Sequence, residues 1–260
     1  MTCKICAQSA LPLGTARLLG KHTIQYFRCG RCGFIQTETP YWLEEAYAQA
    51  INDSDIGLVQ RNLRLAKISK AVVCLFFDPG AKFMDYGGGY GLFVRLMRDA
   101  GFDFYRFDKY CPNLFARTFE AALDIPGRYE LVTAFEVFEH FTNPLKDVGD
   151  LLRFSKNILF STELIPSHTP KPEAWWYYGL DHGQHVALYT RKSLEIMAQS
   201  LGLNLYSDDR RCHLLSERRL PGILFKLIAR QKAAAVLAAL FRRQPLIPAD
   251  YRQITGRDLS

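Results

Sequence analysis

A glycine-rich turn between two short apolar stretches constrains the fold of this chain more than any other feature. Residues 82–85 read as a strand, and the turn GGGYG follows at once at residues 87–91. Glycine has no Cβ, so the backbone can turn sharply here and approach a bound group closely. Residues 91–100 carry apolar side chains at helical spacing, and residues 102–107 read as a second strand. The sequence therefore predicts strand, turn, helix and strand in that order.

Two acidic residues frame this turn. Asp85 ends the first strand and Asp108 follows the second. A helix N-terminus behind a glycine turn favours an anionic ligand group, and an acid after the next strand suits ribose hydroxyls. The glycine spacing is G-x-G-x-G, and NAD sites are expected to show G-x-G-x-x-G. A purely structural turn is the competing interpretation, but the two acids favour a nucleotide-like cofactor.

The segment DYGGGYG at residues 85–91 resembles the D/E-x-G-x-G-x-G motif of class I S-adenosylmethionine-dependent methyltransferases. Asp108 matches the ribose-binding acid of that family. The resemblance implies an α/β fold with a Rossmann-like, doubly wound sheet of seven strands and S-adenosylmethionine as cofactor. Tyr86 departs from the small aliphatic residue that is more usual there. The residues it implies for cofactor binding in this stretch are Asp85, Gly87, Gly89, Gly91 and Asp108.

A second segment carries the same resemblance. Residues 129–135 are β-branched and apolar, as in a buried strand, and the run AFEVFEHFTNP that ends this strand is similar to the fourth-strand motif of the small-molecule branch of the family. This similarity implies that Phe135 and Glu136 contact the cofactor and that His140 lies near cofactor and substrate. The alternative, in which Glu139 and His140 cap the next helix or pair with each other, stays open.

Residues 1–40 contain two matched cysteine pairs, Cys3-x-x-Cys6 and Cys29-x-x-Cys32. Each pair can place two thiolates on one metal ion, and two pairs complete a tetrahedral zinc site. Residues 11–27 can form the hairpin that brings the pairs together. Four cysteines leave no open coordination position, so we expect structural zinc. A redox pair and four unrelated thiols are the weaker alternatives.

Residues 165–189 form a long stretch with three prolines and two glycines, which predicts an irregular loop of functional type. Aromatic side chains stack on sugar or ring faces. We therefore expect this loop and the acid at the end of the preceding strand to bind substrate, although the aromatic residues could instead pack against the cofactor domain. The predicted substrate-binding residues are Trp175, Trp176, Tyr177, Tyr178 and Glu163.

The run HGQHVALYT at residues 182–190 resembles the His-x-His segment of zinc-containing sugar C-methyltransferases, which also begin with a four-cysteine module. The second histidine of that segment is the catalytic base of those enzymes, and it matches His185. We expect His182 or Glu163 to support this base, with His140 as the alternative base. The first histidine is three residues away here and two residues away in the family.

The basic charge of the chain is concentrated in its last 51 residues. Residues 210–260 hold eleven Lys/Arg and three acids, a net +8, and the whole chain has a formal charge of +7. Residues 220–243 form a basic amphipathic stretch, which could pack on the core, contact a partner protein or lie on an anionic membrane surface. Its charged residues interrupt any membrane span. With no signal peptide and an odd number of cysteines, we expect a cytoplasmic protein.

These observations divide the chain into four predicted parts: a zinc-binding module at 1–40, a helical linker or lid at 41–80, a cofactor-binding domain at 81–216 and a basic helical extension at 217–260. The predicted activity is methyl transfer from S-adenosylmethionine to an oxygen or carbon of a sugar, nucleotide-sugar or related small metabolite, with a histidine general base. One alternative is an RNA methyltransferase that uses the zinc module and the basic tail. The other is a zinc-dependent assembly module with a vestigial methyltransferase domain.

The sequence argues against a nucleic acid substrate, because the Asn/Asp-Pro-Pro-aromatic motif of nucleic-acid amino methyltransferases is absent. It does not predict the oligomeric state. The remaining expected elements complete the sheet and its cover. They are helices at 53–77, 113–122, 145–154 and 193–201, and strands at 122–125, 157–162, 203–206 and 212–215.

Overall fold

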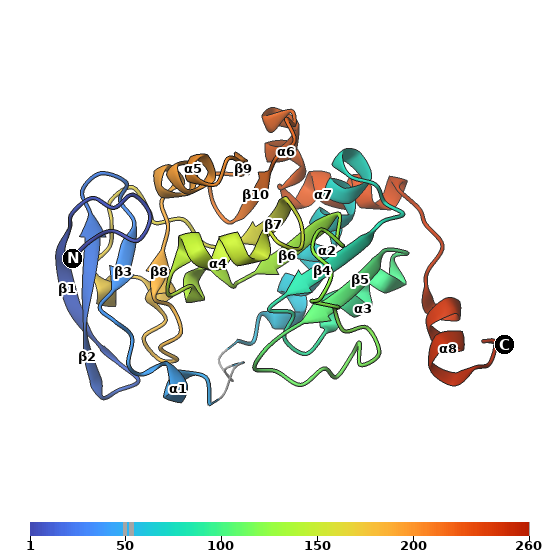
Figure 1. The fold of residues 1–260 in the computed structure, drawn as a ribbon, viewed down its shortest axis with the longest axis horizontal. Helices are drawn as coiled ribbons and strands as arrows, with labels where there is room; N and C mark the ends of the chain where they lie inside the picture. The colour runs from blue at the N-terminus through green and yellow to red at the C-terminus, as the bar shows by residue number, and fades with distance from the viewer. Residues whose placement is uncertain (49–50, 52–54, 260) are drawn as a thin grey trace.

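Two sheets form the framework of the computed structural model, which describes residues 1–48, 51 and 55–259 (Figure 1). The larger sheet has the strand order β5-β4-β6-β7-β10-β9. The pairs β4–β5, β4–β6 and β6–β7 are parallel, and β10 runs antiparallel to both β7 and β9. The strands are β4 Lys82–Tyr86, β5 Asp103–Phe107, β6 Leu131–Phe135, β7 Asn157–Ser161, β9 Asn204–Ser207 and β10 Cys212–Ser216.

Helices cover both faces of this sheet, because parallel strands need crossover connections that return over the sheet. On one face, α2 (Leu58–Phe76) and α3 (Leu92–Asp99) bury their apolar side chains against β4 and β5. On the other face, α4 (Pro144–Leu151) and α5 (Arg191–Ser200) bury their apolar side chains in a cluster with β6 and β7. The central strands are buried from both sides, so their continuous apolar sequences are explained.

The expected seventh strand is absent from the described part of the chain. The structure contains neither a strand at 122–125 nor a helix at 113–122. Leu123 and Ile125 are 40% and 46% exposed, so that segment has little apolar surface to bury against a sheet. A single bridge between Arg106 and Glu120 replaces the strand, and the guanidinium of Arg106 donates to the carbonyl of Cys111 and to Glu120. The prediction of seven strands is not confirmed, since the described residues place six strands in this sheet.

The other expected elements are confirmed with shifted ends. The helix expected at 53–77 is α2, which begins at Leu58, and the first two residues of that prediction lie outside the described residues. The expected closing hairpin is β9 and β10. The helices expected at 91–100, 145–154 and 193–201 are α3, α4 and α5, and the strands expected at 82–85, 102–107, 129–135 and 157–162 are β4, β5, β6 and β7.

The smaller sheet contains the N-terminal cysteines and also a strand from far along the chain. Its order is β1-β2-β3-β8, with β1 Ala10–Leu18 and β2 His22–Cys29 forming the expected hairpin. β3 (Ile35–Thr37) pairs with β8 (Ala187–Leu188), which begins two residues after His185. The helix α1 (Leu43–Ala46) follows β3, and the indole of Trp42 donates to the carbonyl of Gly183 at 2.8 Å. The N-terminal sheet therefore includes a strand from the segment 165–189 and holds the end of that segment in place.

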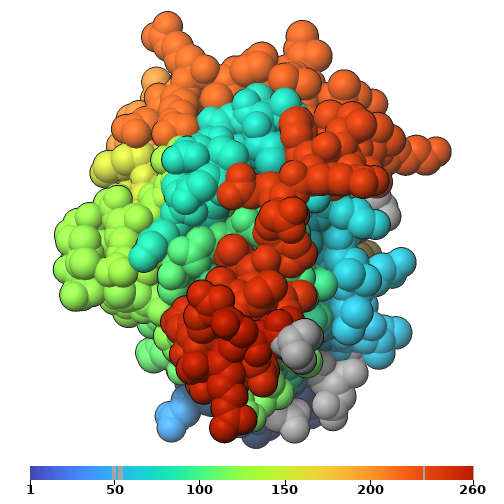
Figure 2. Space-filling model, turned by 90° about the vertical axis from the view of Figure 1, so that its right-hand side faces the viewer, coloured from blue at the N-terminus to red at the C-terminus, as the bar shows by residue number. Residues whose placement is uncertain are grey.

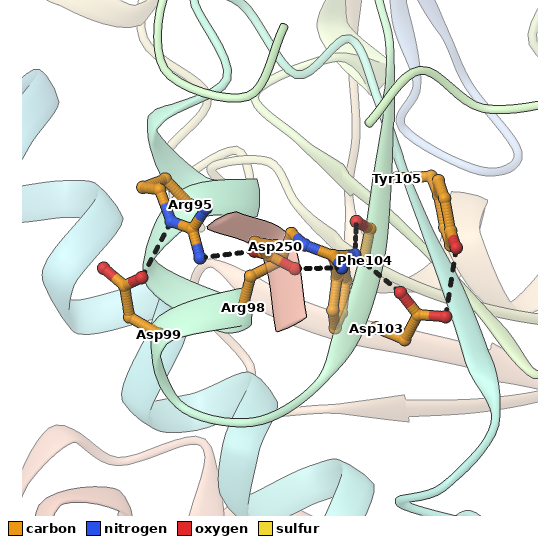
Figure 3. Close-up of polar contacts among 7 residues, drawn as sticks. All are labelled: Arg95, Arg98, Asp99, Asp103, Phe104, Tyr105 and Asp250. Atoms are coloured by element: carbon orange, nitrogen blue, oxygen red, sulfur yellow. Dashed lines mark hydrogen bonds and ion pairs between the residues drawn. The ribbon is translucent and has the colours of Figure 1, made fainter. Parts of the chain in front are cut away.

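The C-terminal extension is helical and is attached to the part of the chain that forms the larger sheet. Its helices are α6 (Gly222–Ile228), α7 (Gln231–Leu240) and α8 (Ile247–Thr255). In Figure 2 the red C-terminal segment lies across one face of the domain. Asp250 of α8 is 3% exposed and accepts two hydrogen bonds from Arg98 of α3, at 2.7 and 2.9 Å, and one from Arg95 at 2.8 Å (Figure 3). None of the described helices has the length and apolar content needed to cross a membrane.

Candidate functional site

A cavity of about 780 Å³ opens at the carboxyl ends of β4, β5 and β6. The glycine turn at 87–91 forms part of its wall, together with the end of β6. Residues from α1 and the start of α2 cover another side, and the loop 165–189 supplies the rest. Open α/β sheets commonly bind ligands at the carboxyl ends of their strands, so this cavity is the candidate site.

The glycine turn needs its glycines for two independent reasons. Gly87 and Gly91 have φ values of +69° and +85°, which L side chains rarely adopt. A Cβ on Gly87 would lie 2.6 Å from Cγ2 of Val137, and a Cβ on Gly91 would lie 2.6 Å from Oδ1 of Asn113. Without side chains, the backbone of the turn forms a close cradle directly before α3.

Asp85 lies behind the turn and is almost completely buried. One of its carboxylate oxygens accepts a hydrogen bond from the hydroxyl of Thr133 at 2.7 Å. Burial raises the pKa of Asp85 to about 7, and the hydrogen bond from Thr133 opposes this shift only in part. A Cβ on Gly88 would lie 2.7 Å from Oδ2 of Asp85, so this carboxylate lies directly against the turn.

Asp108 stands at the edge of the cavity in a fixed orientation. Its Oδ2 accepts the backbone N–H of Gly89 at 2.8 Å, and its Oδ1 accepts those of Tyr110 and Cys111, each at 2.8 Å. A carboxylate oxygen has two lone-pair sites, so Oδ2 keeps one acceptor site after these bonds. Arg106 fixes the same turn by donating to the carbonyl of Gly89 at 2.7 Å.

The end of β6 contributes Phe135 and Glu136 to the cavity wall. Glu136 has a φ of +54°, and its backbone N–H donates to Oγ of Ser161 at 2.9 Å. The hydroxyl of Ser161 donates in turn to the Glu136 carboxylate at 2.5 Å. A non-glycine residue in this region is strained, and it persists because the surroundings hold it.

Three histidines line the opposite side of the cavity. His185 is 8% exposed, and its Nδ1–H donates to the carbonyl of Tyr177 at 2.6 Å. This bond sets the tautomer and leaves the lone pair of Nε2 available. Burial, together with His140 and His182, holds the pKa of His185 well below its usual value.

His140 and His182 flank His185, with ring centroids 5.2 and 4.7 Å from its own. Nδ1 of His140 shares a 2.9 Å hydrogen bond with the hydroxyl of Tyr47. Burial lowers the pKa of His140 to about 3 and also lowers the pKa of His182. Because the pKa of each of the three histidines is lowered, all three imidazoles are neutral at pH 7.

Neither Glu139 nor His140 caps α4, because Asn143 occupies the N-cap position and no side-chain capping bond is present there.

Glu139 is fully buried next to these histidines. Its Oε1 accepts the hydroxyl of Tyr177 at 2.8 Å, and its Oε2 has no hydrogen-bond partner among the described residues. Burial and the nearby Glu136 raise its pKa to about 8. Glu139, His140 and His185 place one possible ligand atom each within 4.8 Å of one another.

The predicted substrate-binding residues lie in three different places in the structure. Trp176, which is 70% exposed, and Tyr177 line the cavity. Trp175 packs with the core of the small sheet, and Tyr178 donates its hydroxyl to the carbonyl of Pro170 on that side. Glu163 lies in a smaller adjoining hollow, in an ion pair of 2.6 Å with Arg211.

Tyr47 follows α1 and orients His140, and no sequence motif marks it. Its only sequence signal is its place in the predicted helical linker or lid at 41–80. Tyr47 contributes to the cavity from 93 residues before His140, a juxtaposition that only the folded chain creates.

The four N-terminal cysteines form a cluster as their spacing predicts. The Sγ atoms of Cys3 and Cys32 are 3.6 Å apart, and those of Cys6 and Cys29 are 3.4 Å apart. All four ligand atoms lie within 4.8 Å of one another. Tetrahedral zinc with Zn–S bonds of about 2.3 Å places its sulfurs about 3.8 Å apart, so the cluster fits such an ion.

A family model described as "Methyltransferase domain" matches residues 59–208, which include the glycine turn, Asp108 and the three histidines. A search of curated proteins found no match. Three similar solved structures are TnmH, magnesium protoporphyrin IX methyltransferase from Synechocystis PCC 6803 with bound SAH, and the plantazolicin methyltransferase BpumL in complex with an analog and SAH.

TnmH is 15% identical, with 68% of this chain and 61% of that chain covered and a TM-score of 0.46. The Synechocystis enzyme is 14% identical, with 67% and 93% covered and a TM-score of 0.40. BpumL is 12% identical, with 68% and 93% covered and a TM-score of 0.46. The chain spans 61% of TnmH and 54% of a similar carbon methyltransferase, CurJ.

Proposed function

The chain belongs to the methyltransferase-domain family, and we propose that it is an S-adenosylmethionine-dependent enzyme that methylates an oxygen or carbon of a sugar, nucleotide-linked sugar or related small metabolite. The observation that carries the proposal is one cavity that joins the glycine turn to three neutral histidines. The match to a methyltransferase family model bears on the methyl donor. The proposal for the methyl acceptor depends on the residues of the cavity wall opposite the glycine turn.

The residues of the glycine turn fit the cofactor. The turn offers a backbone surface that a Cβ would block at Gly87 and Gly91. Asp108 keeps one acceptor site on Oδ2 for a ribose hydroxyl. Phe135 and Glu136 form the adjoining wall. When bound, the cofactor supplies an electrophilic methyl group on a sulfonium.

We assign the general base to His185. Its Nδ1–H is held by Tyr177, so Nε2 presents a lone pair in a site that also contains His140 and His182. Removal of a proton by a positioned base contributes on the order of 10²–10⁴-fold to rate. His182 supports His185, and His140 is the alternative base.

Trp176 supplies the feature expected for a carbohydrate acceptor, because its exposed indole at the cavity wall can stack on a sugar face. The RNA alternative is disfavoured by the position of the basic extension. Of the basic residues at 210–259, Arg211 is the one that reaches a described cavity wall, and it lies in the smaller hollow, paired with Glu163.

We also propose that the four-cysteine cluster binds structural zinc. The sulfurs are spaced for a tetrahedral ion, and a four-thiolate site has no open position for catalysis. Cysteines of this type belong to a reducing compartment, in keeping with a cytoplasmic location.

The test uses zinc-loaded protein, calorimetric titration with S-adenosylhomocysteine, and radiolabelled methyl transfer to a panel of nucleotide sugars. His185→Gln should bind S-adenosylhomocysteine within threefold of the parent and lose turnover by roughly 10²–10⁴-fold. His168→Gln, at an exposed histidine outside the cavity, should behave as the parent in both assays. Unchanged turnover in His185→Gln would remove the base assignment, and no binding of S-adenosylhomocysteine to the parent would overturn the proposal.

A further inference from the structure

We propose that Glu139, His140 and His185 bind a divalent cation at the acceptor end of the cavity. The inference rests on the proposed methyl transfer and deepens it, because such an ion specifies an oxygen atom of the acceptor as the nucleophile.

The first argument is geometric. One carboxylate and two imidazoles place their ligand atoms within 4.8 Å of one another, in side chains that come from residues 139–140 and from residue 185. Two histidines and one carboxylate suit Mn²⁺, Fe²⁺, Co²⁺ or Zn²⁺ and leave coordination positions for substrate. His140 and His185 line the open cavity, so an ion held there could also reach an acceptor.

The second argument is orientation. Metal-binding histidines usually donate their other ring nitrogen to a fixed partner. Tyr177 supplies that partner for His185 through its carbonyl, and the same residue holds Glu139 through its hydroxyl. The hydroxyl of Tyr47 occupies Nδ1 of His140. Each of the three side chains is thus held at one polar atom by a residue outside the group.

The third argument is a buried carboxylate oxygen of Glu139 that lacks a hydrogen-bond partner among the described residues. Glu139 is 0% exposed, and its Oε2 has no hydrogen-bond partner among the described residues. A buried polar atom without a partner costs about 1–3 kcal/mol, and more when it is charged. Arg61 lines the same cavity, but its guanidinium is paired with Asp55 at 2.9 and 2.5 Å. A cation between Glu139 and the two histidines would satisfy this oxygen.

Methyl transfer to an acceptor hydroxyl at this site needs no reactant besides the acceptor, the cofactor and water. An acceptor hydroxyl bound to the ion loses its proton more readily. In this arrangement Nε2 of His185 is a ligand and no longer the base, and Nδ1 of His182 already accepts the backbone N–H of Gln184 at 3.2 Å, so the proton passes to water in the open cavity. The O–H electron pair remains on oxygen and forms the new O–CH₃ bond. The electron pair of the broken C–S bond returns to sulfur, which becomes a neutral thioether.

The test is a titration of full-length protein loaded with one zinc ion per chain, which the four cysteines take up, with Mn²⁺, followed by the loss of the free-ion electron paramagnetic resonance signal, and with Co²⁺, followed by visible absorption. Saturation at one ion per chain is expected. Glu139→Gln, His140→Ala and His185→Gln should each weaken binding at least tenfold, and His168→Gln should leave it unchanged. Titration with S-adenosylhomocysteine on the same samples shows whether each variant retains its fold.

No saturable binding of either ion would overturn the inference, and so would binding that all three substitutions leave intact. Methyl transfer in the parent without ion binding would refute the cation site and leave the proposed function standing. Failure of S-adenosylhomocysteine to bind would instead refute the proposed function, whatever the ion titration shows.

Discussion

The two halves of the cavity are built in opposite ways. The half that we propose binds the cofactor (the cofactor half), formed by residues 85–91 and Asp108, uses backbone geometry from one short stretch of chain. The half that we propose binds the acceptor (the acceptor half), formed by Glu139, His140, Tyr177, His182 and His185, uses buried side chains that distant segments bring together. The first half should therefore tolerate changes elsewhere in the fold, and the second should depend on the small sheet that supports its loop.

Removal of the cysteine cluster should give the largest difference between the two halves, because it should disturb the acceptor half and leave the cofactor half intact. Zinc binding by structural sites is worth on the order of 10 kcal/mol, and β3 of that module pairs with β8 directly after His185. Cys29→Ser should therefore lose its zinc and methyl transfer while binding S-adenosylhomocysteine within threefold of the parent. Elemental analysis, calorimetry and turnover measure the three quantities.

Cys74→Ser is the matched control, because this half-buried thiol on α2 lies outside the cluster. Loss of S-adenosylhomocysteine binding in Cys29→Ser, in parallel with loss of turnover, would show that the two halves are one unit.

Asp85→Asn should change the pH dependence of stability in the cofactor half. The folded pKa of about 7 lies above the ordinary value of 3.8, so the folded state binds this proton more tightly than the unfolded state. Stability is then lost as pH rises from about 4 to about 7, by at most about 4 kcal/mol. Asn carries no such proton, so the variant should gain stability over the parent at pH 8 and little at pH 4.

Urea unfolding of the cofactor-free protein at the two pH values measures this difference. Asp124→Asn, at an exposed aspartate, should leave the pH dependence as in the parent. An equal effect of Asp85→Asn at both pH values would contradict the assignment of the raised pKa.

Gly87→Ala should remove cofactor binding and leave the acceptor half intact. The added Cβ meets Val137 at 2.6 Å in a backbone conformation that alanine rarely adopts. We expect a loss of about 100-fold in S-adenosylhomocysteine affinity, which is about 3 kcal/mol. Gly149→Ala in α4 is the control, since its Cβ would meet nothing within 4 Å. Equal calorimetric affinities for both variants would argue that ligand does not approach the turn.

Tyr177→Phe should give the smallest effect on stability and a selective effect on activity. It removes the hydroxyl that Glu139 accepts at 2.8 Å, and one such bond contributes about 1 kcal/mol. Because groups that orient ligands are worth roughly 10–100-fold, methyl transfer should fall by about that factor at unchanged cofactor affinity.

Tyr178→Phe removes the neighbouring hydroxyl, which bonds to Pro170 on the side of the small sheet. It should lose similar stability in thermal unfolding and retain turnover. Equal losses of turnover in both variants would indicate a general loosening of the loop.

The same contrast explains what the sequence could predict. The glycine turn and the paired cysteines are local patterns whose meaning depends on spacing alone, and the structure brings together the residues that these patterns identify. The inward or outward direction of Trp175, Trp176, Tyr177 and Tyr178 depends on two short 3₁₀ turns packed against the small sheet. No periodicity encodes that choice.

The missing strand shows a related limit. Residues 122–125 have the composition of a short strand, but the side chains that would have to be buried there are exposed. Arg106 uses its donors on the glycine turn and on the chain at Cys111 and Glu120 instead. A buried arginine that organises a loop has no signature in a single sequence, because its partners are set by tertiary structure.

The pairing of Arg98 with Asp250 closes a loop of 152 residues and joins α8 to the helix that begins at the glycine turn. Detachment of α8 would remove the Asp250 carboxylate from the buried Arg98 guanidinium, which lies 3.7 Å over the ring of Phe119 and would keep Asp103 as its remaining carboxylate partner. Such openings are costly, so local fraying of α8 is suppressed. In hydrogen exchange, the amides of α3 and α8 should therefore open together as one cooperative unit, although the two helices lie far apart in the sequence.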